Sequence, residues 1–348
     1  MITFILFIII LGLIVLVHEF GHFIWAKKAG VHVYEFSIGF GPKLFSFNRK
    51  NDETTYLIKA IPLGGYVALA GELSGEGEDD KEVKEENKLY NKPWLSRLMV
   101  MVAGVLNNFI LGFVLLFILG LIYGSTLATN EIANIDKTHP LYKSGARNGD
   151  LIVKINKAKI KDYDDIQTEL ALNGEKKPIT LTYKSKGKEK TVKLKPIYDK
   201  KDKRYYYGIS VKTINKKGIF SSLKFAFVKF CDIYKQLIIV IKSLFTHRIG
   251  VESVSGPVGI FQVIDIAKSS LYMLIYLTAY LSINVGFMNI LPFPAFDGGH
   301  VLFLIIEKIK GSRVDAKLEN TVNLIGFSIL IILMILITIK DVFNLLWK

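Results

Sequence analysis

The sequence predicts a multi-pass α-helical membrane protein with about four transmembrane helices, a membrane-associated β-hairpin and an inserted α+β domain. Two observations predict this class. Apolar residues make up 51% of the 348-residue chain, and they gather in runs of about 20, long enough to cross the roughly 30 Å hydrocarbon core of a bilayer. Between the second and third runs lies a lysine-rich segment of short alternating patterns. The four runs cover residues 2–24, 98–123, 271–291 and 321–339.

The first run is expected to be a permanent span rather than a signal peptide, because it lacks a basic beginning and a small-residue cleavage site. Residues 1–124 are therefore predicted to form the first half of a membrane core, with two spans. Residues 271–348 are predicted to form the second half, with two more. The single cysteine, Cys231, excludes an internal disulfide.

The loop after the first span has two parts of opposite character. Residues 31–70 are β-branched and aromatic and are punctuated by Gly and Pro, a pattern that predicts strands. They are too apolar for a solvent loop, so we expect a hairpin that lies against the membrane or dips into it. Residues 74–92 begin with the run "SGEGEDDKEVKEENK", which predicts a mobile charged loop.

Residues 125–215 are predicted to be a separate domain of short strands. A "GD" turn precedes an alternating strand at 151–155, a helix is expected at 162–171, and a strand hairpin at 177–196. This order resembles a PDZ domain, so we expect a PDZ-like α+β domain, although no carboxylate-binding loop of the usual sequence is visible. The resemblance implies binding of extended peptides by addition of a strand to a sheet edge.

The net charge of +14 is concentrated in this domain, because residues 130–217 hold 22 Lys or Arg against 11 Asp or Glu. A basic region beside a membrane is expected to attract anionic membrane lipids. No nucleic acid is expected as a partner, since the lysines are scattered and no base-reading motif is present.

Residues 216–270 are predicted to form an amphipathic interfacial helix followed by a linker. The stretch 218–248 is apolar enough to suggest a fifth span, but each of its charged residues would be costly in hydrocarbon. We therefore expect a helix in the interface whose lysines extend to the membrane surface. The charged residues are Lys224, Lys229, Asp232, Lys235 and Lys242.

The second span carries glycines at eight-residue spacing, which suit close helix contact. It also carries Asn107 and Asn108, two polar groups in hydrocarbon. Hydrogen bonds between helices or contacts with a substrate would each explain them, and we favour the hydrogen bonds.

The first span contains "LVHEFGHFIWAKK", in which His18, Glu19 and His22 form an H-E-x-x-H motif. Residues four apart share one face of a helix, so the two histidines can bind one metal ion. Glu19 then lies beside the metal as a base toward water. Zinc accepts imidazole and carboxylate ligands and keeps one position open in catalytic sites. A structural metal site or a proton relay would use the same residues.

A third ligand should be acidic, distant in sequence and at the same membrane depth. Asp297 follows the third run in "MNILPFPAFDGGH", where prolines and glycines end or unwind the helix. With four spans the first and third run in the same direction, so their carboxyl ends lie on the same side of the membrane. A turn or helix-cap aspartate is the alternative interpretation.

These motifs, in this order, resemble the site-2 protease family of zinc-dependent intramembrane proteases, most closely its bacterial regulator of sigma-E branch. The N-x-x-P-x-x-x-x-D-G pattern at 289–298 is the second family motif. The resemblance implies that His18, His22 and Asp297 bind Zn²⁺ and that Glu19 is the catalytic acid and base. It also implies that Asn289 holds substrate backbone.

The resemblance further implies that the hairpin contacts substrate. We expect a strand edge at Ile58, Lys59 and Ala60 to pair with an unwound substrate segment. The chain departs from the family in having room for one PDZ-like domain, where well-known members have two, and in carrying Phe296 where leucine is common.

The predicted function is a zinc-dependent membrane metalloendopeptidase that cleaves transmembrane segments of single-pass membrane proteins during regulated intramembrane proteolysis. The family suggests anti-sigma-factor-like substrates or remnant signal peptides. The alternative is a non-catalytic metal-binding membrane scaffold with a PDZ tethering domain. Basic residues beside the spans predict a bacterial inner (plasma) membrane protein whose active site faces the cytoplasm, with the PDZ-like domain on the extracytoplasmic side.

Overall fold

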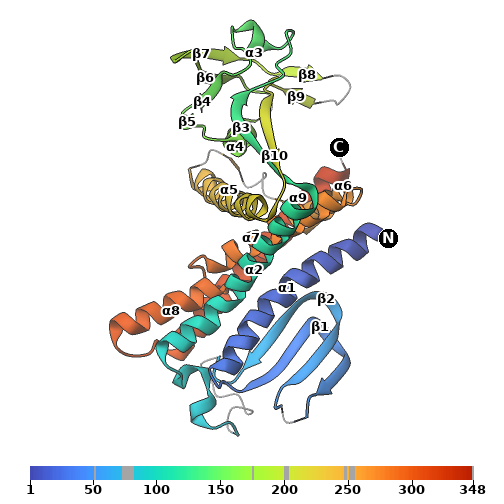
Figure 1. The fold of residues 1–348 in the computed structure, drawn as a ribbon. Coiled ribbons are helices and arrows are strands. Elements are labelled where there is room, and N and C mark those ends of the chain that lie inside the picture. Colours follow the sequence, from blue (N-terminus) through green and yellow to red (C-terminus); the bar gives the residue numbers. More distant parts are fainter. Residues whose placement is uncertain are drawn as a thin grey trace. The chain divides into compact units, whose positions relative to one another are not determined.

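The computed structural model describes residues 1–50, 52–72, 82–174, 176–199, 204–246, 249–250 and 255–346. The chain divides into two compact units, each described below by itself (Figure 1). The first unit comprises residues 1–116 and 251–348, and the second comprises residues 117–250. The predicted domain 125–215 lies within the second unit, and its exact boundaries stay a prediction.

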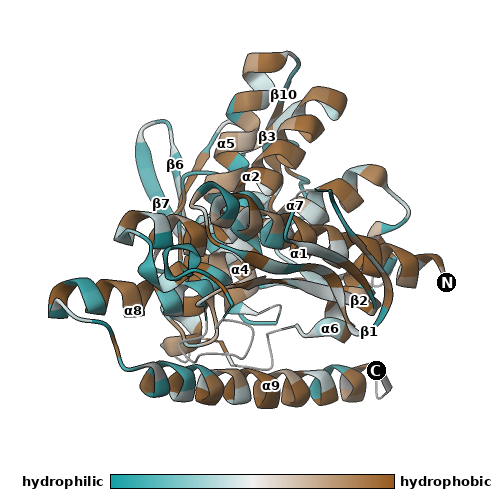
Figure 2. Ribbon diagram, turned by 90° about the horizontal axis from the view of Figure 1, so that it is seen from below, coloured by the Kyte–Doolittle hydropathy of each residue, from teal (hydrophilic) through white to brown (hydrophobic). Residues whose placement is uncertain are grey.

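Four helices of the described chain are long and apolar enough to cross a membrane, and the number that do cross it stays a prediction. Hydrophobic residues dominate these helices, in contrast to strand β7 (Lys188–Leu194) of the second unit, which is largely hydrophilic (Figure 2). Two shorter helices accompany them in the first unit, α6 (Pro257–Ala267) and α8 (Asp297–Lys310). The four long helices are α1 (Ile2–Lys28), α2 (Trp94–Tyr123), α7 (Leu271–Ile290) and α9 (Ala316–Leu346).

Polar contacts hold α8 against the beginning of α2. Arg97 forms a two-pronged ion pair with Glu307, at 2.7 and 2.9 Å, and the indole of Trp94 donates to the carbonyl of Leu304. Paired, planar contacts of this kind fix orientation as well as distance. They set the direction of α8, and Asp297 is the first residue of that helix.

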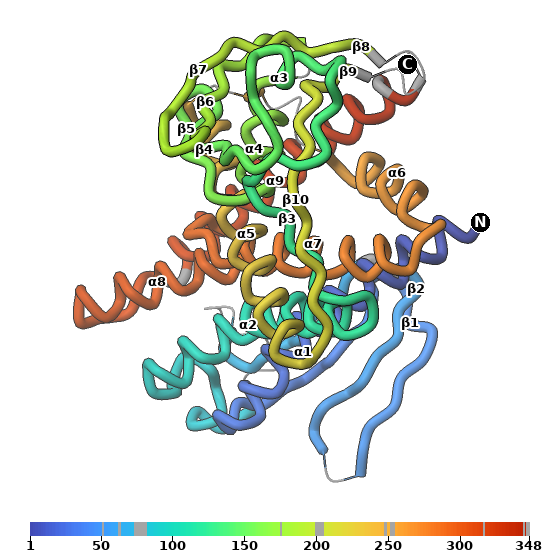
Figure 3. Tube along the Cα trace, turned by 45° about the horizontal axis from the view of Figure 1, so that its top comes forward, coloured from blue at the N-terminus to red at the C-terminus, as the bar shows by residue number. Residues whose placement is uncertain are grey.

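The predicted hairpin consists of β1 (Val33–Asn48) and β2 (Thr55–Leu69), which lie side by side (Figure 3). Both strands bend, so each pairs along two separate stretches. Residues 33–38 pair with 65–69 on one side and with 55–58 on the other, and residues 43–48 pair with 55–59. Four rows therefore lie in the order 65–69, 33–38, 55–59 and 43–48.

The structure describes the charged loop only in part. Residues 73–81 lie outside the described residues. The remainder forms two short 3-10 helices, η2 (Glu85–Asn87) and η3 (Leu89–Asn91). Leu89 is only 3% exposed, and it belongs to the apolar cluster that joins α1 to the hairpin. This buried leucine anchors the chain directly after the charged run 74–88, and the mobility of that run stays a prediction.

The second unit contains an antiparallel sheet with strand order β10-β3-β4-β6-β7, and β5 pairs with β4. The pair β8–β9 forms its own small sheet. Two helices, α3 (Pro140–Lys143) and α4 (Tyr163–Asn173), belong to the same unit. The strands are β3 (Ser125–Ile132), β4 (Leu151–Ile155), β5 (Ala158–Lys159), β6 (Ile179–Ser185), β7 (Lys188–Leu194), β8 (Ile197–Asp199), β9 (Arg204–Tyr206) and β10 (Val211–Lys216).

The predicted alternation builds the core of this unit. Ile152 and Ile155 of β4 are fully buried together with Ile166 of α4 and Tyr183 of β6. Asp162 caps α4 by accepting a hydrogen bond from the amide of Asp165. The predicted strand at 151–155, helix at 162–171 and hairpin at 177–196 are therefore confirmed in kind.

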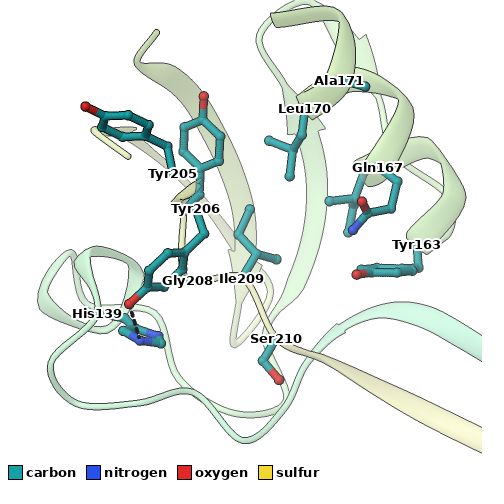
Figure 4. Close-up of a pocket in the computed structure, with 12 residues that line it drawn as sticks. His139, Tyr163, Gln167, Leu170, Ala171, Tyr205, Tyr206, Gly208, Ile209 and Ser210 are labelled. Atoms are coloured by element: carbon teal, nitrogen blue, oxygen red, sulfur yellow. Dashed lines mark hydrogen bonds between the residues drawn. The ribbon is translucent and has the colours of Figure 1, made fainter. Parts of the chain in front are cut away.

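An open pocket of about 610 Å³ lies between α4 and residues 205–210 (Figure 4). Ile166 and Leu170 line the α4 side, whereas Gly208 and Ile209 line the opposite wall. The amide N–H groups of Gly208 and Ile209 have no hydrogen-bond partner in the part of the chain that is described. The sequence pattern did not predict this groove.

The segment 218–248 forms α5 (Ile219–Phe245), and residues 247–248 lie outside the description. Two of its lysines form ion pairs with α4: Lys229 with Asp164, at 2.5 Å, and Lys235 with Asp165. Asp232 lies between them, where burial, followed by the nearby carboxylates of α4, raises its pKa to about 7. Three of the five charges that make a transmembrane α5 costly therefore face α4, whereas Lys224 and Lys242 are exposed.

Candidate metal centre

The helical spacing of H-E-x-x-H directs His18 and His22 from α1 toward α2. Nδ1 of His22 lies 2.8 Å from the carbonyl of Val100, and Nδ1 of His18 lies 3.1 Å from the amide nitrogen of Asn108. A Cβ added to Gly104 would lie 2.3 Å from Nε2 of His22 and 2.7 Å from Cε1 of His18. The absence of a side chain at Gly104 therefore makes the room that both imidazoles occupy.

Asp297, the third residue of the site, directly follows the break between α7 and α8. Prolines at 292 and 294 cannot continue the helix. Ala295 adopts a left-handed φ of +72°, which is uncommon for a residue with a side chain. α8 then begins at Asp297. Strained backbone of this kind clusters at functional sites, where surrounding structure holds it in place.

Three donor atoms converge at this point. Nε2 of His18 and Nε2 of His22 are 3.2 Å apart, and Oδ2 of Asp297 lies 3.3 and 3.5 Å from them, respectively. Zinc–ligand bonds of about 2.0–2.1 Å in a tetrahedral arrangement would place donor atoms about 3.3–3.4 Å apart. The observed triangle has these dimensions, so the donors fit one zinc ion with a fourth position left open.

The surroundings of the Asp297 carboxylate agree with this fit. Its Oδ2 is buried and accepts no hydrogen bond from any described residue, even though two imidazole nitrogens lie within 3.5 Å. A buried carboxylate oxygen without a partner is costly. A cation at the centre of the triangle would satisfy all three donors together. Among the described residues, these three form a cluster suited to a metal.

Glu19 lies on the side of α1 that faces the hairpin. A Cβ added to Gly65 would be 3.3 Å from Cγ of Glu19, and the backbone of Val67 interacts with its carboxylate. The outer row 65–69 therefore runs beside Glu19.

Of the expected substrate edge at Ile58, Lys59 and Ala60, the structure places Ile58 inside the sheet, and a role of these residues toward substrate stays a prediction. Ile58 pairs with Ile38 on one side and with Phe45 on the other. Its row is therefore internal to the sheet, and its backbone is already paired on both sides. The cause is the bending of both strands, which folds a two-stranded hairpin into four rows. The outer row beside α1 is 65–69.

The other polar residues of the spans have distinct positions. Asn107 donates to the carbonyl of Val17, at 3.1 Å, and Asn108 contacts His18, so both link α2 to α1 as favoured. Asn289 lies in the last turn of α7, partly exposed, and its amide has no hydrogen-bond partner among the described residues. Gly104 and the contact of Asn108 with His18 are parts of the site that the sequence did not identify, although the glycine spacing hinted at close contact.

The model of "Peptidase family M50" matches residues 6–333 of this chain. The chain is 39% identical to a candidate zinc metalloprotease of Clostridium acetobutylicum, with 96% of each chain covered. It is 31% identical to the candidate protease Eep of Enterococcus faecalis, with 98% of each covered. A crystal structure of the PDZ domain of an SdrC-like protein from Listeria monocytogenes matches 25% of this chain and 87% of that chain, at 18% identity and a TM-score of 0.20. That likeness is too slight to carry an argument, so the PDZ-like assignment stays a prediction.

Gly104→Ala should lower zinc affinity by about tenfold or more, the scale on which disturbed ligand support acts. The reason is that the added methyl group would collide with both imidazoles. Zinc content of the purified protein and competition with a chelator measure the effect. Gly112→Ala is the matched control, since its methyl group would press on Ile283 of α7 instead. Undiminished zinc affinity in Gly104→Ala would contradict this account of the site.

Proposed function

The chain belongs to peptidase family M50, the site-2 protease family, and we propose that it cleaves peptide bonds within transmembrane segments of single-pass membrane proteins. It is a membrane-embedded zinc metalloprotease. In this proposal His18, His22 and Asp297 hold the zinc, and Glu19 is the catalytic acid and base. The observation that carries the assignment is the triangle of donor atoms, with sides of 3.2 to 3.5 Å.

Zinc bound there supplies Lewis acidity toward a peptide carbonyl and toward water. The remaining steps belong to the chain's own residues. Glu19 takes the proton of the attacking water and passes it to the leaving amine, a role that general acid–base groups perform in peptide hydrolysis. The row 65–69 holds the carboxylate of Glu19 close to the substrate segment.

The alternative of a non-catalytic scaffold requires the three ligands but no carboxylate at position 19. Glu19 is a partly buried acid in an apolar helix, directed at the hairpin rather than at solvent. A scaffold gains nothing from such a costly residue. Family membership as a metalloprotease also favours catalysis.

We propose that the substrate adds to the sheet as an extended strand along the row 65–69. A peptide bond within a formed helix is shielded by its own hydrogen bonds, so the substrate must unwind before hydrolysis. Pairing with an outer strand replaces the lost hydrogen bonds. The free amide of Asn289 is suited to bind backbone groups that remain unpaired. Anti-sigma-factor-like proteins and remnant signal peptides are the proposed substrates, following the family resemblance.

The proposed location is a bacterial inner membrane, with the active site toward the cytoplasm and the PDZ-like domain outside. The carboxyl ends of α1 and α8 and the segment that leads into α9 are basic, and the orientation of spans follows such residues in short loops. These residues are Lys27, Lys28, Lys308, Lys310, Arg313 and Lys317.

We propose that α5 lies in the membrane interface. Phe220, Phe227 and Phe245 are 88%, 63% and 80% exposed within the described structure, and they recur along one side of the helix. An exposed aromatic stripe on a helix that also carries exposed lysines, here Lys224 and Lys242, is typical of interfacial binding. Membrane lipids are the partner that this stripe suits.

Glu19→Gln should reduce cleavage of a model transmembrane peptide by about a hundredfold or more, the size of a general acid–base contribution, and leave zinc content unchanged. Cleavage and zinc content are measured on the purified protein. His18→Ala is the contrasting control, which should lose zinc as well as activity. Normal cleavage by Glu19→Gln would exclude the proposed role of Glu19.

Ala68→Pro should slow cleavage of a substrate with a stable helix about threefold to tenfold more than cleavage of one with a weak helix, the worth of a backbone hydrogen bond. The N–H of residue 68 faces the row 33–38, so the proline breaks the pairing that keeps the outer row regular and thereby distorts the edge to which the substrate would add. Ala68→Val retains the N–H and is the matched control. The measurement is a ratio of cleavage rates for two peptides that differ only in glycine content near the cleaved bond. Equal losses for both peptides would argue against strand addition.

The orientation is tested with single cysteines in a Cys231→Ser background. A cysteine at Lys186, in the exposed turn between β6 and β7, should react with a membrane-impermeant maleimide in intact cells. A cysteine at Ser312, after α8, should react only after the membrane is opened. The reverse pattern would overturn the proposed orientation.

A further inference from the structure

Asn108 connects three helices at the metal centre. Its side chain is fully buried, and its amide nitrogen lies 3.1 Å from Nδ1 of His18. Its backbone carbonyl accepts a hydrogen bond of 2.8 Å from the hydroxyl of Ser282 on α7. The amide oxygen of Asn108 is also buried, but it has no hydrogen-bond partner among the described residues.

The position of the hydrogen on His18 follows from its other nitrogen. Nε2 of His18 faces the donor atoms of His22 and Asp297, at 3.2 and 3.3 Å. A neutral imidazole that gives the lone pair of Nε2 to a metal carries its hydrogen on Nδ1. That N–H group would then face the NH₂ group of Asn108, and two donors cannot form a hydrogen bond.

A rotation of the Asn108 amide by half a turn resolves this conflict. The nitrogen and oxygen of an asparagine amide have nearly the same size, so the hydrogen-bond network decides which atom occupies which position. After rotation, the oxygen that lacks a partner accepts the N–H of His18. His22 provides a parallel, because its Nδ1 lies 2.8 Å from the carbonyl of Val100, which can only accept.

We propose that Asn108 is a positioning residue whose amide oxygen accepts the Nδ1–H of His18, so that Nε2 of His18 is fixed toward the metal. α2 then supplies one acceptor for each ligand histidine, an amide oxygen for His18 and a backbone carbonyl for His22. Such acceptors fix the tautomer and the ring orientation of a ligand and strengthen its bond to the metal. This inference rests on the proposed role of His18 as a zinc ligand.

Asn107 provides a matched comparison on the same helix. It donates to the carbonyl of Val17, at 3.1 Å, and so links α2 to α1 without a hydrogen bond to an imidazole. Loss of its side chain removes a hydrogen bond between helices that is similar in strength to the one between Asn108 and His18. A purely structural role for Asn108 would therefore give both asparagines the same effect on zinc binding.

The test is zinc affinity of the full-length purified protein, measured by competition with a chromophoric chelator. Asn108→Leu and Asn108→Ala, which lack an acceptor, should weaken zinc binding about 10-fold to 100-fold. Asn108→Asp keeps an acceptor of the same shape and should stay within about threefold of the unmodified chain, as should Asn107→Leu.

Wild-type affinity in both Asn108→Leu and Asn108→Ala would overturn the inference. Equal weakening in Asn108→Asp would overturn it as well, because the amide nitrogen would then be the group that matters. His18→Ala separates the two levels of the argument. If this variant binds zinc as tightly as the unmodified chain, the proposed zinc site itself fails. If it loses zinc while the Asn108 variants keep it, only the role of Asn108 fails.

Discussion

The metal centre depends on how closely α1 and α2 approach each other. A Cβ added to Gly21 would lie 2.4 Å from the carbonyl oxygen of Ala103, and one added to Gly104 would lie 2.3 Å from His22. Lipid gives apolar helices little reason to associate, so close packing through small residues provides the attraction. The same contact brings the imidazoles to acceptors on α2. The same contact therefore associates the two helices and orients the two histidines. A larger side chain at either glycine would disturb both.

Polar groups within the membrane core are paired across helices. The amide of Asn107 donates to the carbonyl of Val17, and the hydroxyl of Ser282 donates to the backbone carbonyl of Asn108. This pairing removes the large cost of leaving polar groups bare in hydrocarbon. Oδ2 of Asp297 lacks such a partner among the described residues, and it lies 3.3 Å from Nε2 of His18. A metal ion bound between the three donor atoms would satisfy it.

The sequence predicted the parts of the site that depend on local geometry and on span direction. The separation of His18 from His22 is fixed by helical periodicity, and Asp297 follows from the parity of the spans. The role of Gly104 and the contact of Asn108 with His18 could not be predicted, because they depend on the rotation of α2 about its own axis. The number of spans predicts the direction in which each helix crosses the membrane, but it does not predict how the helix is rotated about its own axis.

The order of the rows in the hairpin could not be predicted for a different reason. The β-branched and aromatic residues of 31–70 predict strands, but the order of rows depends on where the strands bend. Gly39 and Gly41 adopt φ values of +88° and +83°, conformations that glycine enters readily, and they divide β1 into two pairing stretches. The strand pattern alone does not predict how many rows the sheet has or in which order they lie. The fold of the second unit was more predictable, since its strands are short and its turns are local.

The position of the outer row explains why a sheet is useful beside this site. An open strand edge in an apolar environment is costly, because its N–H and C=O groups lack partners. An unwound substrate helix has the same deficiency. Pairing the two satisfies both sets of groups in one step, and the row 65–69 that would do so runs past Glu19. Under the proposed function, the same need for hydrogen bonds that keeps a transmembrane helix intact would hold the extended substrate next to Glu19.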